Sequence, residues 1–314
     1  MNSVFMSNVL QNLNYRLVYG FFWLLSLLPM AVLYVISDFI YLIVYYVARY
    51  RRNVVRQNIA GSFPDKDKAY LTEVERGFYH FFCDYIVENI KLFSMSKKEM
   101  MKRMTFSGLD DARHRFENGK DFLFLYLGHY GNWEWIASLQ YWMPYAHCTQ
   151  IYHPLYNKIA DKIFIDLREQ YGGECIPMKK TLRRILQMKK EGLKVVVGFI
   201  SDQLPKWNSI HHFTHFLNRE TAVFTGTEEI SKKIGAMVYY GRMTRPKRGY
   251  YHCDLILMTD SPEQFEDFDL TDMYMRMLET DIVENPAIWL WSHKRWRRTK
   301  ERWLERQKAG LHNG

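Results

Sequence analysis

The sequence predicts an α/β protein whose mixed central sheet is covered by helices and preceded by a transmembrane or membrane-embedded N-terminal helix. Three observations lead to this prediction. A long uncharged segment lies near the N-terminus, short apolar runs typical of buried strands occur after residue 120, and helix-like segments alternate with strand-like ones. Hydrophobic residues make up 48% of the 314 residues and charged residues 25%, a composition that excludes intrinsic disorder.

The N-terminal apolar segment is long enough to cross a bilayer. Residues 17–37 contain no charged side chain, and after Asp38 the apolar sequence continues to Ala48. Because a spanning helix needs about 20 such residues, we expect residues 1–48 to form a membrane anchor. A single tilted helix is the preferred prediction, and a hairpin divided at Pro29 is the alternative. The segment is too long for a cleaved signal peptide, and no small-residue cleavage site follows it.

The charges around this segment predict its orientation. Arg49, Arg51, Arg52 and Arg56 follow it, whereas only Arg16 precedes it. The positive-inside rule then places residues 49–314 in the cytoplasm as one domain attached to the inner membrane. Lys and Arg exceed Asp and Glu by 9, which favours anionic partners. The four cysteines are widely spaced and are expected to be buried thiols.

The remaining chain alternates between predicted strands and helices. Residues 66–104 have apolar positions at helical spacing, and residues 121–127 and 193–200 are short apolar runs expected in strands buried on both faces. The other predicted strands are 147–151, 174–177, 236–243 and 249–258, and the other predicted helices are 133–142, 157–171, 181–190 and 225–234.

The main candidate site follows the first of these buried strands. Gly128, His129, Gly131 and Asn132 belong to the sequence GHYGNWE, in which His129 and Glu134 form a His-x4-Glu motif. Such a pair alone is weak, since about one is expected by chance, but the carboxyl ends of strands in open α/β sheets are where ligands bind. We expect Glu134 to accept a ring N–H of His129 and to make the other ring nitrogen a better base. No Ser or Cys stands in this turn as a nucleophile, so the pair suits deprotonation of an acceptor hydroxyl or amine. A histidine with only a structural role in the turn is the alternative.

The motif and its surroundings resemble the late acyltransferases of lipid A biosynthesis, within the lysophospholipid acyltransferase-like group. The resemblance rests on GHYGNWE and on an ordered set of further segments: RRNVVRQNIAGSFP, YHPLYN, LREQYGG, the strand ending in SDQ, FLN, and NPAIWLWSHKRW. Together they cover most of residues 15–297. The resemblance implies a glycerolipid-acyltransferase-like fold.

The resemblance also implies roles for individual residues. His129 is the general base and Glu134 its orienting partner. Arg168 holds a phosphate or polarises a carbonyl, and Asp202 helps to organise the pocket. Gly131 and Asn132 are expected to contribute to substrate binding. Backbone N–H groups of the glycine-rich turn and Arg168 are candidate donors to the oxyanion.

The implied reaction is direct transfer of an acyl chain from a thioester, on acyl carrier protein or less often coenzyme A, to a hydroxyl of a lipid A precursor. It needs no metal, cofactor or covalent enzyme intermediate. The expected partners are this donor, an anionic lipid acceptor and inner-membrane lipid. Another lipid acceptor, such as a lysophospholipid or an aminolipid, remains open, as does a non-catalytic lipid-binding role.

Three further patterns have alternative interpretations. The histidines of the sequence HHFTH at 211–215 lack further ligands at zinc spacing, so a channel-lining loop is preferred over a metal site. Trp and Arg interleave in residues 289–303, which favours a membrane interface over nucleic acid, with core packing of Trp289 and Trp291 as the alternative. The basic turn at 245–248 is expected to be a solvated hairpin, with carrier-protein docking as the alternative.

Overall fold

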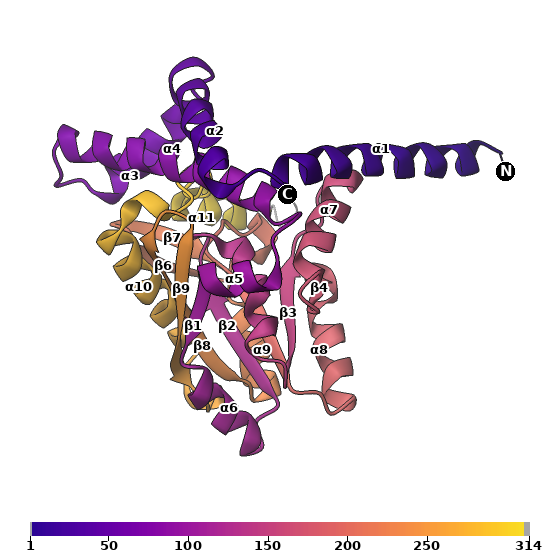
Figure 1. The fold of residues 1–314 in the computed structure, drawn as a ribbon. Helices are drawn as coiled ribbons and strands as arrows, with labels where there is room; N and C mark the ends of the chain where they lie inside the picture. Colours follow the sequence, from indigo (N-terminus) through magenta and orange to yellow (C-terminus); the bar gives the residue numbers. More distant parts are fainter. Residues whose placement is uncertain (1, 311–314) are drawn as a thin grey trace.

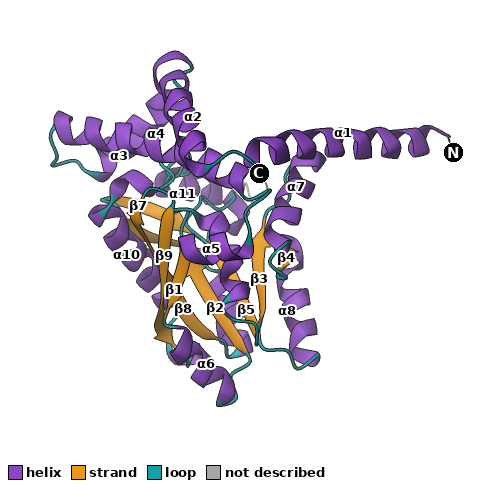
Figure 2. Ribbon diagram, in the orientation of Figure 1, coloured by secondary structure: helices purple, strands orange, loops and turns teal. Residues whose placement is uncertain are grey.

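A computed structural model describes residues 2–310, and their side chains from residue 12 onward. Its central element is a twisted sheet with helices on both faces, and a group of N-terminal helices lies across one end of the sheet (Figures 1 and 2). Those N-terminal elements are α1 (Asn2–Ser26), α2 (Met30–Leu42) with a π-helical continuation (Ile43–Val47), α3 (Arg52–Ser62) and α4 (Lys68–Lys91).

The sheet has seven strands in the order β1-β9-β8-β2-β5-β3-β4. Their bounds are β1 Met104–Ser107, β2 Phe122–Leu127, β3 His147–Tyr152, β4 Glu174–Pro177, β5 Val195–Ile200, β8 Met237–Lys247 and β9 Tyr250–Thr259. Neighbouring strands are parallel except β8 and β9, which pair antiparallel. The predicted mixed sheet is therefore confirmed, and β1 is a strand that the sequence pattern did not reveal.

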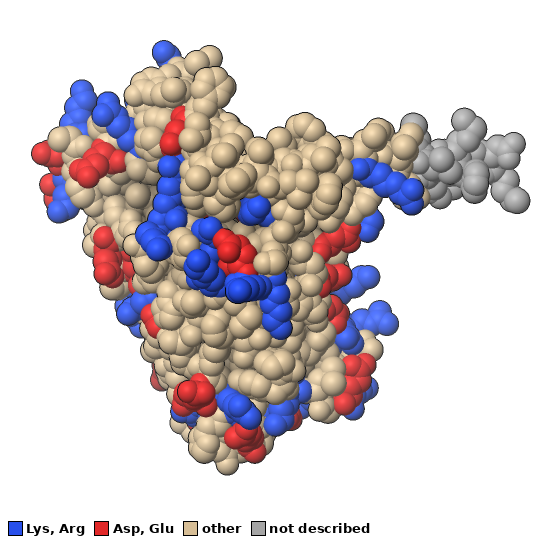
Figure 3. Space-filling model, viewed as in Figure 1, with Lys and Arg blue, Asp and Glu red and all other residues tan. Residues whose placement is uncertain are grey.

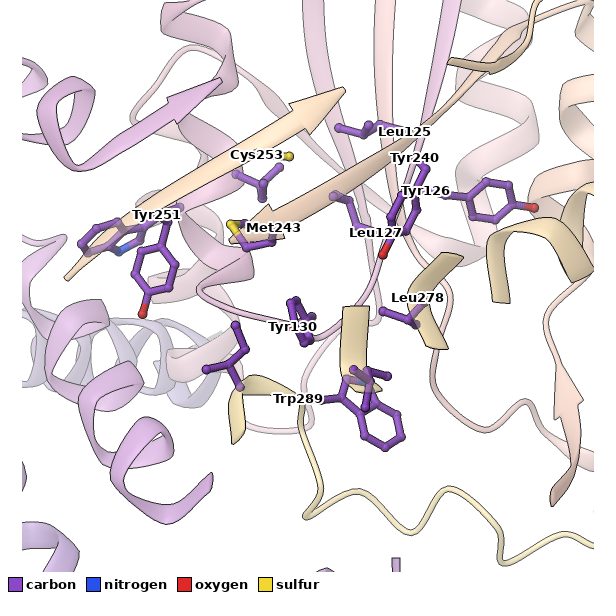
Figure 4. Packing of buried hydrophobic residues seen from close by; sticks show 14 of the residues in the cluster. Leu125, Tyr126, Leu127, Tyr130, Tyr240, Met243, Tyr251, Cys253, Leu278 and Trp289 are labelled. Atoms are coloured by element: carbon purple, nitrogen blue, oxygen red, sulfur yellow. The ribbon is translucent and has the colours of Figure 1, made fainter. Parts of the chain in front are cut away.

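The apolar sequence of strand β2 follows from its position in the middle of the sheet. All six of its residues are buried, because helices cover both faces of the sheet. On one face, Phe122 and Phe124 pack with Ile185 of α8 (Thr181–Lys190). On the other face, Leu123 and Leu125 join the larger core. Figure 4 shows Leu125 and Leu127 in this core, near Met243 of β8.

The other helices are close to their predicted positions. This holds for α5 Lys97–Arg103, α7 Lys158–Glu169 and α9 Gly226–Ile234, whereas no position was predicted for α6 Leu109–Glu117, α10 Asp269–Glu284 and α11 Lys300–Lys308. The 3₁₀ segments are Trp133–Tyr141, Met178–Lys180, Trp207–Ser209, Pro262–Gln264 and Pro286–Ile288. The predicted helix at 133–142 is thus a 3₁₀ segment. All four cysteines are buried and free, as expected.

The segment at 211–223 is a hairpin and not the predicted loop. Strands β6 (His212–Phe216) and β7 (Arg219–Val223) pair antiparallel outside the main sheet. Leu217 and Asn218 both have positive φ angles and form the two-residue turn between them. His212 contacts Asp272 of α10 at 2.8 Å, and the described residues contain no group of three or more His, Cys, Asp or Glu side chains that could hold a metal ion.

The N-terminal apolar segment forms two helices instead of the preferred single one. Helix α1 ends at Ser26, and Pro29 precedes the first residue of α2, where a residue without an N–H is tolerated. Within the described residues, one helical stretch, Met30–Val47, is long and apolar enough to cross a membrane, with a mean hydropathy of 1.9. Large apolar side chains such as Val35 and Phe39 are exposed there, and the surface over α1 and α2 is mostly uncharged (Figure 3). This fits a membrane-embedded helix.

Charged contacts attach α2 to the rest of the molecule. Ser37 donates to Asp84 of α4 at 2.7 Å, and Arg245 from the β8–β9 hairpin contacts the same carboxylate at 2.7 Å. Arg248 of the hairpin turn contacts both Asp84 and Asp38. Arg248 therefore joins α2 to α4, whereas Arg245 binds α4 alone. The prediction of a solvated turn is wrong for Arg245, whose side chain is 15% exposed, but it holds for Arg248, whose side chain is 38% exposed.

Candidate active site

The register of the central strands places the candidate histidine. In the parallel pair β2–β5, Leu127 lies opposite Ile200. The residues that leave these strands, His129 after β2 and Asp202 after β5, therefore emerge side by side at the carboxyl edge of the sheet. Residues 73 positions apart in the sequence meet there.

Asp202 binds the imidazole of His129 directly. The Nδ1 atom of His129 lies 2.6 Å from Asp202 Oδ1, and the backbone N–H of His129 donates to Asp202 Oδ2 at 2.9 Å. The indole N–H of Trp289 donates to the same Oδ2 at 2.8 Å. Asp202 is only 2% exposed, so its carboxylate depends on these donors for the interactions that it loses with water.

These contacts keep Asp202 ionised. Burial alone raises its pKa, but the charge of the His129 imidazole and the hydrogen bonds from His129 and Trp289 outweigh that effect and lower the pKa to about 2. An ionised carboxylate beside Nδ1 requires a proton on that nitrogen. In the neutral form of the imidazole the lone pair therefore lies on Nε2, toward which Gln203 directs its side-chain amide at 3.1 Å. The His129 side chain, which carries Nε2, is 19% exposed and therefore partly open to solvent.

Glu134 has a different partner from the predicted one. Arg168 of α7 donates from Nε and Nη2 to the two oxygens of the Glu134 carboxylate, at 2.7 and 2.8 Å. Tyr85 of α4 is a third donor, at 3.4 Å. Burial acts to raise the pKa of Glu134, but the charge and hydrogen bonds of Arg168, with a smaller contribution from His129, lower it.

The orienting carboxylate of His129 is therefore Asp202, and the expected contact between Glu134 and the imidazole is replaced by the pair with Arg168. The physical reason is the chain direction after the strand. The 3₁₀ segment that begins at Trp133 carries Glu134 to α7, whereas Asp202 leaves the adjacent strand next to His129. Glu134 still influences the imidazole through its charge, since His129 contributes to the lowered pKa of Glu134.

Gly131 and Asn132 shape the loop between these groups. Gly131 has a φ of +63°, and a Cβ atom there would lie 2.5 Å from Met243 Cγ, so glycine fits this position best. Its N–H donates to the carbonyl of Ile288 at 2.9 Å. Asn132 is fully buried and donates to Glu88 of α4 at 2.9 Å. Both contacts are with other residues of the protein, so substrate binding by Gly131 and Asn132 stays a prediction.

The candidate oxyanion donors already have partners. The N–H of His129 is bound to Asp202, that of Gly131 to Ile288, and the guanidinium of Arg168 to Glu134. In this conformation the N–H groups of His129 and Gly131 are occupied, and oxyanion binding by N–H groups of the turn stays a prediction. Arg168 retains the N–H groups that Glu134 does not occupy, because a guanidinium has five donors.

Sequence reasoning missed the contribution of the C-terminal tryptophan-rich segment to this site. Trp289 and Trp291 are buried, and Figure 4 shows Trp289 beneath the loop that carries Tyr130. The Nε2 atom of His293 accepts the N–H of Leu204 at 3.2 Å. Arg295 is 1% exposed; burial lowers its pKa to about 10, opposed by the charge of Asp202. These side chains support the carboxyl edge of the sheet next to His129 and Asp202, and the interfacial interpretation is wrong for Trp289, Trp291 and Arg295. No periodicity in the sequence indicates this role.

The contact with Asp202 fixes the tautomer of the His129 ring, as a histidine base requires. One comparison with known proteins identifies the family of the whole chain. The model of the bacterial lipid A biosynthesis acyltransferase family matches residues 6–298. The chain belongs to this family. The match spans α1, the whole central sheet and the site around His129, so the family assignment covers fold and site together. A search of curated proteins finds no match.

Proposed function

We propose that the protein transfers a fatty acyl chain from an acyl thioester to a hydroxyl of a lipid A precursor, with His129 as the general base. The observation that supports this most is the contact between His129 Nδ1 and the buried carboxylate of Asp202, at 2.6 Å. A protonated Nδ1 leaves Nε2 as the acceptor for a substrate proton. The family assignment supports the acyl transfer chemistry.

The chemical step follows from this protonation state. Nε2 of His129 takes the hydroxyl proton of the acceptor while the hydroxyl oxygen attacks the thioester carbonyl. The tetrahedral intermediate collapses by breaking the carbon–sulfur bond, and the thiolate that leaves takes the proton from the imidazolium. The result is an ester and a thiol, with the histidine unchanged. The ionised Asp202 stabilises the imidazolium that forms between these two proton transfers.

Glu134 and Arg168 form a second charged pair next to the base. Both groups are largely buried, and their two-point contact fixes the start of the 3₁₀ segment relative to α7. We infer that the free N–H groups of Arg168 stabilise the oxyanion or bind a phosphate, and that Glu134 orients that guanidinium. Asp202 takes over the orienting function first expected of Glu134.

The site is proposed to operate at the cytoplasmic face of the inner membrane. Residues 1–48 form the anchor and residues 49–314 the acyltransferase domain. The exposed apolar side chains of Met30–Val47 favour insertion, and the arginines that follow favour a cytoplasmic location for the domain. The donor is an acyl group on acyl carrier protein or coenzyme A, and the acceptor is an anionic lipid, both compatible with the net charge of +9.

Mass spectrometry of lipid A from a strain that lacks the protein tests this function. The strain should contain lipid A with one acyl chain fewer. The wild-type chain should restore it, as should the control Arg113→Gln, whose exposed side chain pairs with Glu117 on α6, at the opposite end of the sheet from the site (Figure 1). His129→Ala should not restore it. Unchanged lipid A in the deletion strain, with altered phospholipids or aminolipids, would show that the acceptor is a different lipid.

A further inference from the structure

A hollow lined by arginines lies directly after the membrane-embedded helix. Its volume is about 330 Å³, at the lower end of the range for small-ligand sites. Its lining residues are Arg49, Arg51, Arg52, Asn53, Val54 and Arg56. The apolar helix ends at Val47, so the hollow follows it within a few residues, a position that suits contact with lipid phosphates when the helix is in a membrane.

The hollow has an excess of positive charge. Arg52 and Arg56 share the carboxylate of Glu75, at 3.0 and 2.9 Å. Arg49 and Arg51 instead donate to backbone carbonyls, and within residues 12–310 neither forms an ion pair. Four arginines against one glutamate give the group a net charge of +3, since 4 − 1 = 3. The charges of Arg49 and Arg51, which no carboxylate among the described residues offsets, therefore remain available to an anionic ligand.

The start of helix α3 belongs to the same hollow, and the N–H of its first residue, Arg52, donates to the carbonyl of Arg49 at 3.2 Å. Arg49 and Arg51 both adopt positive φ angles, and helix α3 starts at Arg52 immediately after this sharp turn. The first N–H groups of a helix have no partner within the helix and attract anions. Guanidinium groups match phosphate oxygens by paired hydrogen bonds. Side chains and backbone together thus offer the kind of environment that a phosphate group prefers.

The hollow is also joined to the catalytic edge. Arg51 Nη1 donates to the carbonyl of Ser292 at 3.1 Å, and Asn58 of α3 donates to the carbonyls of Trp291 and His293. His293 in turn accepts the N–H of Leu204, two residues after Asp202. Burial lowers the pKa of His293 to about 4, with the charges of Arg295, His129 and Arg51 acting in the same direction and that of Asp202 opposing them. Arg51 and His129 therefore both act on the same residue, His293.

We propose that this arginine hollow binds a phosphate group of the acceptor lipid and so fixes the distance between that headgroup and His129. The inference rests on the proposed function, because it requires a phosphorylated acceptor. Its connection to His293 favours the acceptor as the source of the phosphate, since a contact with bulk phospholipid would not need to adjoin the catalytic residues. The arginines are positioning residues, and they do not take part in the proton transfer.

Steady-state kinetics with two acceptors test the hollow. The phosphorylated lipid A precursor and the same lipid after enzymatic dephosphorylation are compared, with one acyl thioester donor and purified protein in detergent. For the double variant Arg49→Gln/Arg51→Gln we expect the KM for the phosphorylated acceptor to rise about tenfold or more, as expected for lost charge-assisted contacts, with kcat and the donor KM little changed. The dephosphorylated acceptor should bind wild type and variant equally weakly.

Three matched variants make the result specific. Arg113→Gln removes one exposed arginine elsewhere and should leave both KM values unchanged. Arg49→Gln alone breaks only a contact with the carbonyl of Tyr46 and should show the same selective effect in smaller size, even if the double variant is unstable. Arg49→Lys/Arg51→Lys keeps the charge and should restore much of the affinity for the phosphorylated acceptor.

Two outcomes overturn the proposal. The first is a KM ratio between the two acceptors that stays at the wild-type value in the arginine variants. The second is the same unchanged KM ratio combined with weaker binding of the arginine variants to vesicles of phosphatidylethanolamine and phosphatidylglycerol. That result assigns the hollow to bulk lipid. If the wild-type protein acylates neither acceptor, the proposed function fails instead, so the two failures are distinguishable.

Discussion

His129 and the buried Asp202 form a pair, with Nδ1 and Oδ1 2.6 Å apart, at the ends of two adjacent parallel strands. The carboxylate also accepts the backbone N–H of His129, so one aspartate fixes both the ring and the main chain of the histidine. In the proposed mechanism, this contact determines which ring nitrogen is the base.

Asp202→Asn should lower kcat by about 10² to 10⁴, because the amide no longer holds a proton on Nδ1 or stabilises the imidazolium. The KM for the donor should change little. Steady-state acyl transfer measures this effect. Asp272→Asn is the matched control, since Asp272 contacts His212 in a similar pair outside the site. Equal losses in both variants would contradict a specific role for Asp202.

Glu134→Gln should destabilise the protein by about 3 kcal/mol or more, because it leaves the largely buried guanidinium of Arg168 without its carboxylate. Thermal unfolding in detergent measures the change. Removing both partners together should cost less than the sum of the single changes. Glu117→Gln, which breaks the exposed pair with Arg113, should change stability by less than about 1 kcal/mol. Additive effects of Glu134 and Arg168 would be incompatible with a coupled pair.

Stability should fall as the pH decreases from 6.5 toward 4, partly because of His293. Its pKa is lowered from 6.5 to about 4 by burial, so the unfolded chain binds the proton first. The contribution of the neutral His293 ring to the free energy of unfolding is intact above pH 6.5 and is lost progressively down to about pH 4. Protonation of the ring then breaks the hydrogen bond that it accepts from the N–H of Leu204. Melting temperatures across this range should decline less in His293→Gln than in wild type. Identical slopes would refute the assignment.

The exposed apolar face of α2 should be needed for membrane association. Val35→Asp combined with Phe39→Asp places two charges on that face, each costing about 3 kcal/mol in a membrane. A much larger fraction of the protein should then leave the membrane in an alkaline wash. Val283→Asp, which alters an exposed valine of α10, should leave the distribution unchanged. Retention of the α2 variant would mean that another segment provides the anchor.

The elements with continuous apolar runs could be predicted from the sequence. The strands at 121–127 and 193–200 were expected within two residues of β2 and β5, because burial on both faces leaves few alternatives for such sequences. Helix α8 and strand β4 have the predicted bounds, since turn-forming residues flank them. The position of His129 at a strand end followed from the same runs.

The partner of His129 could not be predicted from spacing within the motif. Glu134 lies five residues from His129, but the pairing of β2 with β5 depends on the order of strands in the sheet, which local patterns do not encode. The same limit applies to Trp289 and His293, which reach the site only through tertiary packing. The break between α1 and α2 was considered through Pro29, but length alone favoured one continuous helix.

Acyl transfer by purified His129→Asn protein, compared with wild type on a lipid A precursor and an acyl thioester donor, tests the central claim most directly. Wild type should produce a lipid with one additional ester-linked acyl chain and one equivalent of free thiol. His129→Asn should be slower by about 10² or more with the same product. A His129→Asn protein that transfers the acyl chain at the wild-type rate would contradict the account.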